Sequence, residues 1–169
     1  MIRPRSAVLA TALMCLAVAG AMPGFAGEVP SVAFLGFALI NSSLEQTTPA
    51  EMQRLEMLDD LFHERLNASG RFKVIPIPAD MQAKIQSGPA ISGCNGCERD
   101  LATRAGADWA AWGTVQKVSN LILNINLYME DARTGKMEFV KSVDIRGNTD
   151  ESWRHGFDYM IRHYLLVEP

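Results

Sequence analysis

The pattern of apolar and polar residues predicts two strands in the first half of the chain. Residues 32–40 contain no polar side chain, and a short run of this kind is typical of a strand that is buried on both faces. Residues 72–75 predict a shorter strand, which Pro76 and Pro78 end because proline cannot donate to a β-ladder. The polar residues 41–46 predict a loop after the first strand.

A long helix with one apolar face is predicted between these strands. Thr48 can cap its first turn, Pro49 suits the first helical position, and Glu51 completes a capping box. Gly70 is expected to end the helix in the left-handed conformation. Apolar residues recur at helical spacing, and the expected core face consists of Leu55, Leu58, Phe62 and Leu66.

The middle of the chain predicts only short elements. Residues 79–86 suit one or two helical turns, and residues 87–96, which contain three glycines and a proline, predict a loop. Residues 98–105 predict a short helix, and Gly106 is expected to end it.

Three strands and a final helix are predicted for the rest. The strands are residues 109–118, 121–130 and 137–146, and the alternation of apolar and polar residues in the middle one predicts one buried and one wet face. Residues 131–136 have hairpin-turn chemistry, with Gly135 free to take a positive φ. Asn148 or Thr149 can cap the helix, and its expected core stripe is Trp153, Phe157, Met160, Tyr164 and Leu165.

This order of elements predicts an α/β (α+β) fold. A first crossover strand beside an antiparallel C-terminal meander gives a mixed β-sheet, and two main helices are expected to cover its apolar face. We find no internal repeat or linker that would divide residues 27–169, so they are expected to form a single domain.

The amino-terminal residues have the pattern of an export signal. Arg3 and Arg5 precede an apolar run at residues 7–19, and small residues favour cleavage after Ala26. The run is shorter than the ~20 residues that a membrane-spanning helix needs. We therefore expect residues 1–26 to be a cleaved signal peptide, the mature chain to lack an integral membrane span, and its location to be the periplasm.

Charge and motifs exclude several classes of function. The chain has 16 Lys and Arg against 19 Asp and Glu, a net charge of −3, and its basic residues do not cluster, so nucleic acid is not an expected partner. The sequence contains no Gly-rich phosphate loop and no nucleophile elbow. We predict no catalytic residue, no metal site and no cofactor, and we place Asp59, Asp60 and Glu64 on the wet side of the long helix.

Cys94 and Cys97 form the sharpest local motif. In an oxidising compartment an even pair of cysteines predicts a disulfide. A structural clip is the first interpretation, and a redox dithiol is the alternative because Cys97 stands near a helix start, where a thiol's pKa is lowered. A zinc site needs about four ligands, and this pair supplies only two cysteines. A c-type haem motif requires His after the second Cys, whereas residue 98 is Glu.

Aromatic residues on the predicted strands are candidate partner contacts. Trp109 and Trp112 lie three residues apart, so their side chains should point to opposite faces of the sheet. One of them is expected in the core, whereas an exposed one could anchor a partner. The same applies to Tyr128 and Phe139.

The chain resembles the amino-terminal domain of TolB and the small secreted TolB-like domains. The likeness covers about residues 32–166. It is carried by residues 32–37, by the passage from helix to strand at residues 58–74, by the Gly-Ala-Asp turn and strand at residues 105–115, by the hairpin at residues 131–135 and by Trp153-Arg-His155. The β-propeller of TolB has no counterpart here, and the cysteine segment at residues 87–98 is not part of the TolB pattern.

The resemblance implies a non-enzymatic adaptor or accessory domain that faces protein partners in the envelope. We therefore expect interaction with a periplasmic or envelope protein, in the service of an envelope or periplasmic enzyme system. A thiol-disulfide redox protein that uses Cys94 and Cys97 is one alternative, and a periplasmic carrier of a small ligand or metal is another.

Overall fold

The structure is a computed structural model, and it describes residues 28–87, 91–94 and 96–167. The expected signal peptide at residues 1–26 lies outside the described residues, as do parts of the expected loop, residues 88–90 and 95. Both remain predictions.

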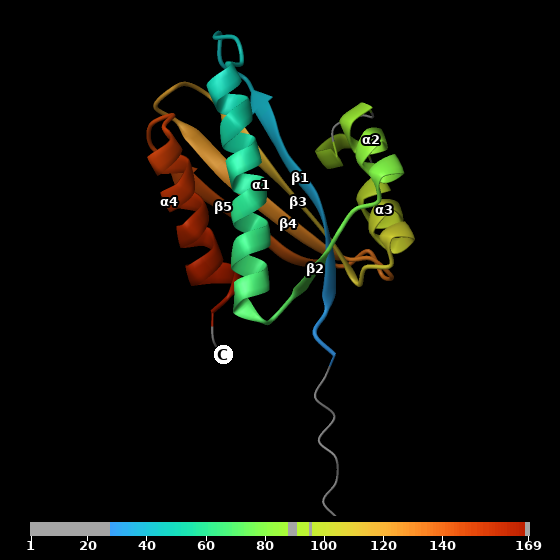
Figure 1. The fold of residues 1–169 in the computed structure, drawn as a ribbon. Coiled ribbons are helices and arrows are strands. Elements are labelled where there is room, and N and C mark those ends of the chain that lie inside the picture. Colours follow the sequence, from blue (N-terminus) through green and yellow to red (C-terminus); the bar gives the residue numbers. More distant parts are fainter. Residues whose placement is uncertain (1–27, 88–90, 95, 168–169) are drawn as a thin grey trace, which may run out of the picture.

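The elements follow the predicted order along the chain (Figure 1). The strands form one five-stranded sheet in the order β2-β1-β3-β4-β5, in which β1 is parallel to β2 and β3, and β3, β4 and β5 form an antiparallel meander. The predicted mixed-sheet α/β fold is confirmed. The elements are β1 (Ser31–Asn41), α1 (Pro49–Ser69), β2 (Lys73–Ile75), α2 (Ala79–Ser87), the 3₁₀ turn η1 (Ile91–Gly93), α3 (Cys97–Ala105), β3 (Trp109–Lys117), β4 (Leu123–Asp131), β5 (Met137–Ile145), α4 (Asp150–Met160) and the π-helical turn η2 (Ile161–Leu165).

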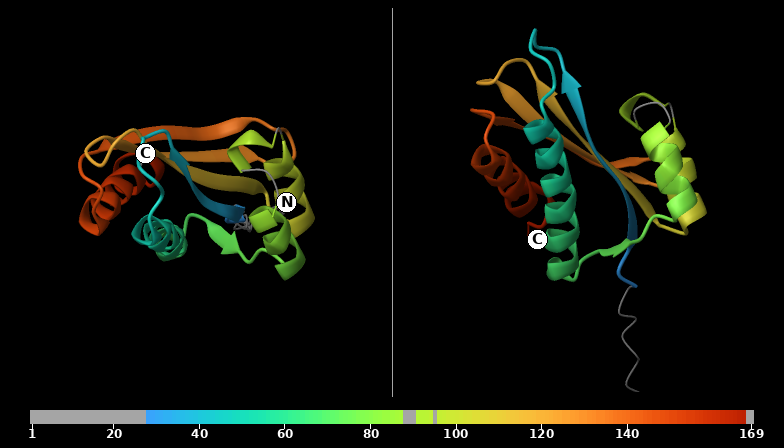
Figure 2. Two further views of the ribbon diagram at one scale, coloured as in Figure 1. Left: turned by 90° about the horizontal axis from the view of Figure 1, so that it is seen from above. Right: turned by 45° about the horizontal axis from the view of Figure 1, so that its top comes forward.

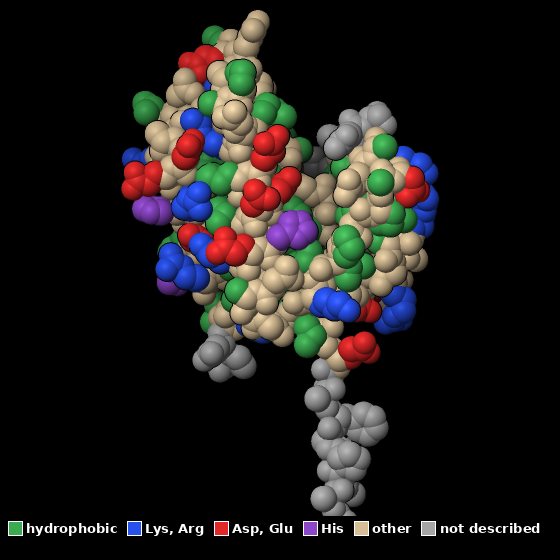
Figure 3. Space-filling model, viewed as in Figure 1, with side chains coloured by type: hydrophobic (Ala, Val, Ile, Leu, Met, Phe, Trp, Pro, Cys, Tyr) green, Lys and Arg blue, Asp and Glu red, His purple; other side chains and the backbone are tan. Residues whose placement is uncertain are grey.

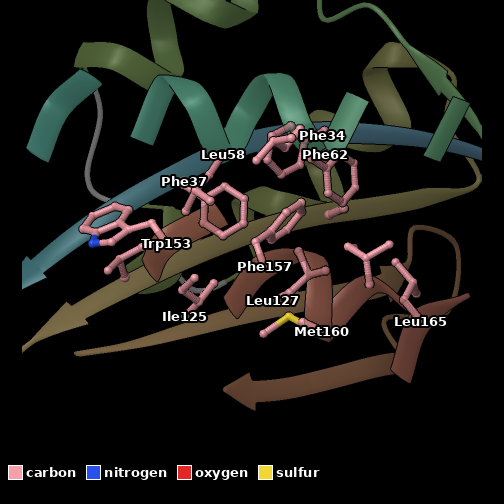
Figure 4. Packing of buried hydrophobic residues seen from close by; sticks show 14 of the residues in the cluster. Phe34, Phe37, Leu58, Phe62, Ile125, Leu127, Trp153, Phe157, Met160 and Leu165 are labelled. Carbon is pink, nitrogen blue, oxygen red and sulfur yellow. The ribbon is translucent and has the colours of Figure 1, made fainter. Parts of the chain in front are cut away.

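The main core lies between the sheet and the two long helices. Figure 2 shows α1 and α4 side by side on one face of the sheet. Aromatic rings fill the space between these layers, and the ring of Phe34 on β1 stacks on that of Phe62 on α1 with centroids 3.9 Å apart. Trp153 and Phe157 of α4 are fully buried beside them (Figure 4). The two covering helices are thus those that the sequence predicts.

A second, smaller core lies against the other side of β1 and β3. Its buried residues include Leu35, Met81, Leu101 and Trp112, which come from β1, α2, α3 and β3. The short helices α2 and α3 therefore form a separate lobe beside the sheet (Figure 2), and this lobe gives β1 cover on both of its faces.

The capping chemistry of α1 is confirmed. The side chain of Thr48 accepts from the N–H of Glu51, the side chain of Glu51 accepts from the N–H of Thr48, and Gly70 ends the helix with φ 64°. These contacts satisfy backbone groups that a helix end leaves without partners.

The expected core stripe of the last helix is wrong at Tyr164. That side chain is 39% exposed, whereas Ile161 and Leu165 are buried. The cause is the π-helical turn η2, whose wider winding advances each residue by less than the 100° of an α-helix. Tyr164 therefore faces outward although its spacing from Trp153 and Phe157 suits an α-helical stripe.

Candidate functional site

An apolar groove lies between α1 and the lobe of α2 and α3. Its volume is about 750 Å³, within the range of roughly 300–1,000 Å³ that is typical of ligand-binding clefts. In Figure 3 it is the hollow between the body of the molecule and the smaller lobe. Residues 34–39 of β1 form its floor, and its walls include Met52, Leu55, Asp59 and His63 of α1 and Ile77, Gln82, Ile85 and Ile91 on the opposite side.

The floor of the groove is an irregular part of β1. The register between β1 and β3 shifts between Phe34 and Phe37, and Gly36 within this bulge has φ 93°, which favours glycine. The ring of Phe37 then crosses the backbone of β3 at Gly113, where an added Cβ would lie 2.0 Å from the ring. Gly36 thus allows the bulge in β1, and Gly113 on β3 leaves room for the ring of Phe37.

Asp59 lies over this bulge and not on the wet side of α1, where the sequence analysis placed it. Its Oδ1 accepts a hydrogen bond of 2.8 Å from the backbone N–H of Phe37. Burial raises the pKa of Asp59 to about 7, and the nearby charges of Asp60 and Glu56 act in the same direction against the hydrogen bond from Phe37. A carboxyl group with a raised pKa in a cleft marks a candidate functional position.

His63 lies one helical turn after Asp59 on the same wall of the groove. Its ring stands edge-on to the rings of Phe34 and Phe62, with centroids 5.6 and 6.3 Å away. Partial burial lowers the pKa of His63, although Asp60 acts in the opposite direction.

The groove is lined by few polar side chains. Asp59 and His63 are the only titratable residues among the described lining residues, and no hydrogen bond joins them in the described structure. Thr47, the one hydroxyl-bearing residue of this lining, accepts from the side chain of Asn41, and the amide of Gln82 donates to the carbonyl of Ile77. A nucleophile next to a base, which covalent catalysis requires, is not present among these residues.

Cys94 and Cys97 are joined as a disulfide, with their Cα atoms 5.6 Å apart. The bond ties Cys94, the residue after η1, to Cys97, the first residue of α3. The backbone N–H of Cys94 donates to the carbonyl of Ile91, a residue of the groove wall. The buried carboxylate of Glu98 accepts from the N–H of Gly96. The disulfide therefore fixes one wall of the groove, and whether it also has redox activity stays a prediction.

The side chains of Cys94, Cys97 and Glu98 are of types that can bind a metal ion, and they lie close together. Cys94, Cys97 and Glu98 have their sulfur and carboxylate atoms within 4.8 Å of one another. Two sulfur atoms that are bonded to each other are not the thiolates that bind zinc. In the disulfide form, this cluster is a covalent clip.

The four aromatic candidates lie along the sheet and not in the groove. Trp109 and Trp112 belong to the cores on opposite faces, as their spacing predicts. Trp112 is only 5% exposed and stacks on Tyr128 at 5.4 Å. Trp109 packs on Phe72, and Phe139 packs against the main core. Trp109, Tyr128 and Phe139 are half-buried, and their contact with a partner stays a prediction.

Sequence reasoning missed Asp59 and Gly36, although a signal existed for each. Asp59 follows Leu55 by four residues, which places it near the apolar stripe of α1. A glycine within an apolar strand is a signal for a bulge. The groove itself has no local signal, because its floor and walls come from β1, α1 and α2, and no pattern within one element shows how the three pack together.

Comparison with solved structures shows a fold shared at low identity. The lipoprotein GNA1162 from Neisseria meningitidis matches with a TM-score of 0.50 and 17% identity, covering 72% of this chain and 83% of that one. PelC from Paraburkholderia phytofirmans, a dodecamer, matches with a TM-score of 0.50 and 12% identity, covering 78% and 84%.

TolB from Acinetobacter baumannii matches with a TM-score of 0.45 and 14% identity, covering 79% of this chain and 28% of TolB. The resemblance to TolB domains in particular stays a prediction, since GNA1162 and PelC share the fold as well. None of the curated proteins matches this chain.

The family comparison covers nearly all of the described fold. Residues 30–165 match DUF3280, a family described as "Protein of unknown function (DUF2380)". Among the described residues, no helix has both the length and the apolar character needed to cross a membrane.

Proposed function

The chain belongs to the DUF3280 family, described as "Protein of unknown function (DUF2380)", and on that premise we propose that it is a non-enzymatic adaptor of the periplasm or envelope. In this proposal it binds a protein partner in the groove between α1 and α2 and thereby assists an envelope or periplasmic system. The predicted signal peptide at residues 1–26 and the disulfide between Cys94 and Cys97 both support an oxidising compartment.

One observation carries the proposal. The groove is a concave, mostly apolar surface whose only charged lining side chain among the described residues, Asp59, has no ion-pair partner among them. Its pKa is raised because the carboxyl group is buried, so ionisation there costs stability. A costly group in an otherwise apolar cleft is more readily understood as a recognition element than as packing.

The shared fold supports the same class of role without deciding it. GNA1162 is a lipoprotein and PelC is a dodecamer, so this fold occurs in proteins that are anchored or assembled. We take from them the expectation that this chain also acts through association.

The test is capture of the partner by cross-linking. The tagged mature chain is cross-linked in its native periplasm, recovered and examined by mass spectrometry. We expect a reproducible protein partner with the wild-type chain and its loss with Gln82→Trp, since Gln82 lines the groove on α2. The matched control is Lys84→Trp, two residues further on the same helix and not among the lining residues.

A double variant without the two cysteines distinguishes an adaptor from a thiol-disulfide redox protein. Capture that survives Cys94→Ala/Cys97→Ala supports the adaptor. Mixed disulfides trapped through Cys94 or Cys97, with no other partner, would overturn it in favour of a redox protein. A partner that is retained equally by Gln82→Trp and Lys84→Trp would place the interaction outside the groove.

A further inference from the structure

We propose that the groove receives an extended segment of the partner protein, which pairs with the open edge of β1 and directs a Lys or Arg side chain to Asp59. This inference rests on the proposed function and specifies how the partner is held. It follows from three features of the described structure, which are the incomplete cover of the β1 edge, the direction of its backbone groups and the charge of the groove.

The outer edge of β1 is covered over only part of its length. The neighbouring strand β2 pairs with β1 at three positions, from Ser31 to Ala33. Pro76 follows β2 directly and leads the chain away toward α2 (Figure 1), because proline has no N–H to continue the ladder. Within the described residues, no strand continues the line of β2 beside residues 34–41.

The backbone groups of this open segment point toward the groove. The N–H of Ser42 donates to the carbonyl of Lys117 on the β3 side, whereas the N–H of Phe37 points the other way, to Asp59. Because successive residues of a strand face opposite neighbours, Leu39 and Asn41 share the direction of Phe37. An added strand would find the N–H and C=O groups of Leu39 and Asn41 on this edge, next to the N–H of Phe37 that Asp59 already occupies, as in strand addition to an exposed sheet edge.

The walls of the groove suit the side chains of such a segment. In strand addition, main-chain hydrogen bonds provide affinity and pockets for alternate side chains provide specificity. Leu55 on one wall and Ile77 and Ile85 on the other are apolar. Alternate apolar residues of an extended segment would therefore have apolar surface on which to pack.

The negative charge near the groove favours a basic residue in the partner segment, in addition to its apolar residues. Glu56 and Asp60 lie close enough to Asp59 to influence its ionisation, and none of the three has an ion-pair partner among the described residues. No Lys or Arg is found in the described lining. A cationic side chain entering the groove would favour the ionised form of Asp59 and compensate its charge, and an anionic one would be repelled.

The experiment uses a phage-displayed library of random linear heptapeptides, selected against the full mature chain at neutral pH. We expect enrichment of sequences with alternate apolar residues and one Lys or Arg. The best synthetic peptide is then N-methylated at each backbone amide in turn. Methylation should weaken binding about fivefold or more at every second position and little between, since each strand hydrogen bond contributes about 1 kcal/mol.

The role of the charge is tested with Asp59→Asn, which keeps an oxygen to accept from the N–H of Phe37. We expect this variant to bind the cationic peptide about tenfold more weakly, as for a hydrogen bond between charged groups. It should bind the same peptide with norleucine in place of the basic residue as well as the wild-type chain does. Glu64→Gln is the matched control, since Glu64 is exposed on the same helix and does not line the groove, and it should change affinity less than twofold or so.

Several outcomes would overturn the inference. The selection could enrich no peptide, or N-methylation could weaken binding without alternating along the peptide. Asp59→Asn could bind the cationic peptide as tightly as the wild-type chain does. A second copy of the chain could also fill the groove, which would be seen as a dimer that the peptide does not dissociate. If the native partner is still captured while the peptide cannot displace it, the adaptor function stands and the strand pairing fails. If the wild-type chain captures no partner at all, the function itself fails.

Discussion

The ammonium group of Lys117 and the carboxylate of Glu51 lie 2.7 Å apart, and the two side chains are 1% and 0% exposed. This pair joins the end of β3 to the first turn of α1. Asn148, in the loop before α4, donates to the same carboxylate and accepts from the indole N–H of Trp153. One buried polar network therefore holds the sheet and both covering helices together at one end of the domain.

Removal of one member of this pair should be strongly destabilising. Lys117→Met leaves the carboxylate of Glu51 buried without its cation, and we expect a loss of about 3–5 kcal/mol in the free energy of unfolding, measured by urea denaturation. The double variant Lys117→Met/Glu51→Gln should recover much of this loss, because it removes the uncompensated charge and keeps a capping-box side chain. A single variant as stable as the wild-type chain would contradict the role assigned to the pair.

Acid should weaken the same network. Burial alone would raise the pKa of Glu51, but hydrogen bonds from Lys117, Thr48 and Asn148 together lower it to about 2. A carboxyl group with a lowered folded-state pKa stabilises the fold above its unfolded value, and this stabilisation is lost as pH falls toward the folded value. Thermal unfolding between pH 5 and pH 2 should show a steeper loss for the wild-type chain than for Glu51→Gln.

Asp59 should have the opposite dependence on pH. Its pKa rises from 3.8 to about 7 on folding, so the folded chain binds more protons than the unfolded chain between these values. Stability is therefore full below the unfolded pKa and falls as pH rises toward about 7, by at most about 1.4 kcal/mol per pH unit. Asp59→Asn should remove this slope, as measured by unfolding at pH 5 and at pH 7.5.

The comparison of variants isolates Asp59 from other titrating groups. His63, whose pKa is lowered, makes the fold more stable as pH rises toward 6.5 and so opposes Asp59 in part of the window. His63 is present in both chains, so its contribution is common to the two slopes. Equal slopes for the wild-type chain and Asp59→Asn would show that the carboxyl group is not buried as described.

Gly113 should not tolerate even a methyl group. A Cβ at this position would lie 2.0 Å from the ring of Phe37, and overpacking of this kind typically costs about 1–3 kcal/mol. We expect Gly113→Ala to lower the free energy of unfolding by that amount and Phe37→Leu to relieve part of the loss in the double variant. Gly93→Ala, where a Cβ meets nothing within 4 Å, is the control and should have little effect.

Reduction of the disulfide should loosen the groove wall more than the main core. The bond closes a very small loop, so its expected stabilisation is on the order of 2 kcal/mol. Hydrogen exchange should become faster in η1 and the start of α3 after Cys94→Ala/Cys97→Ala, with little change in α4. Equal acceleration throughout the domain would contradict a local role of the clip.

Local chemistry explains why so much of the fold was predictable. Thr48, Glu51 and Gly70 define α1 through contacts within a few residues of each other, and the alternation in β4 is a property of one strand. The inward position of Asp59 and the outward position of Tyr164 depend on contacts that are not local. The first requires the bulge of β1, and the second requires a π-helical turn at the end of α4.

The parallel pairing of β1 with β3 also determines how the domain must fold. Ser31 and Asp108, which hydrogen-bond at the start of this pairing, are 77 residues apart in sequence. The meander from β3 to β5 forms from consecutive hairpins, whereas the part of β1 beyond Ala33, which β2 does not pair with, gains a neighbour only when β3 is available. The continuously apolar residues 32–40 are thus the first strand of the fold and among the last to be fully paired. During that interval this strand is exposed to aggregation, and a chaperone that shields residues 32–40 would act at the slowest step of maturation.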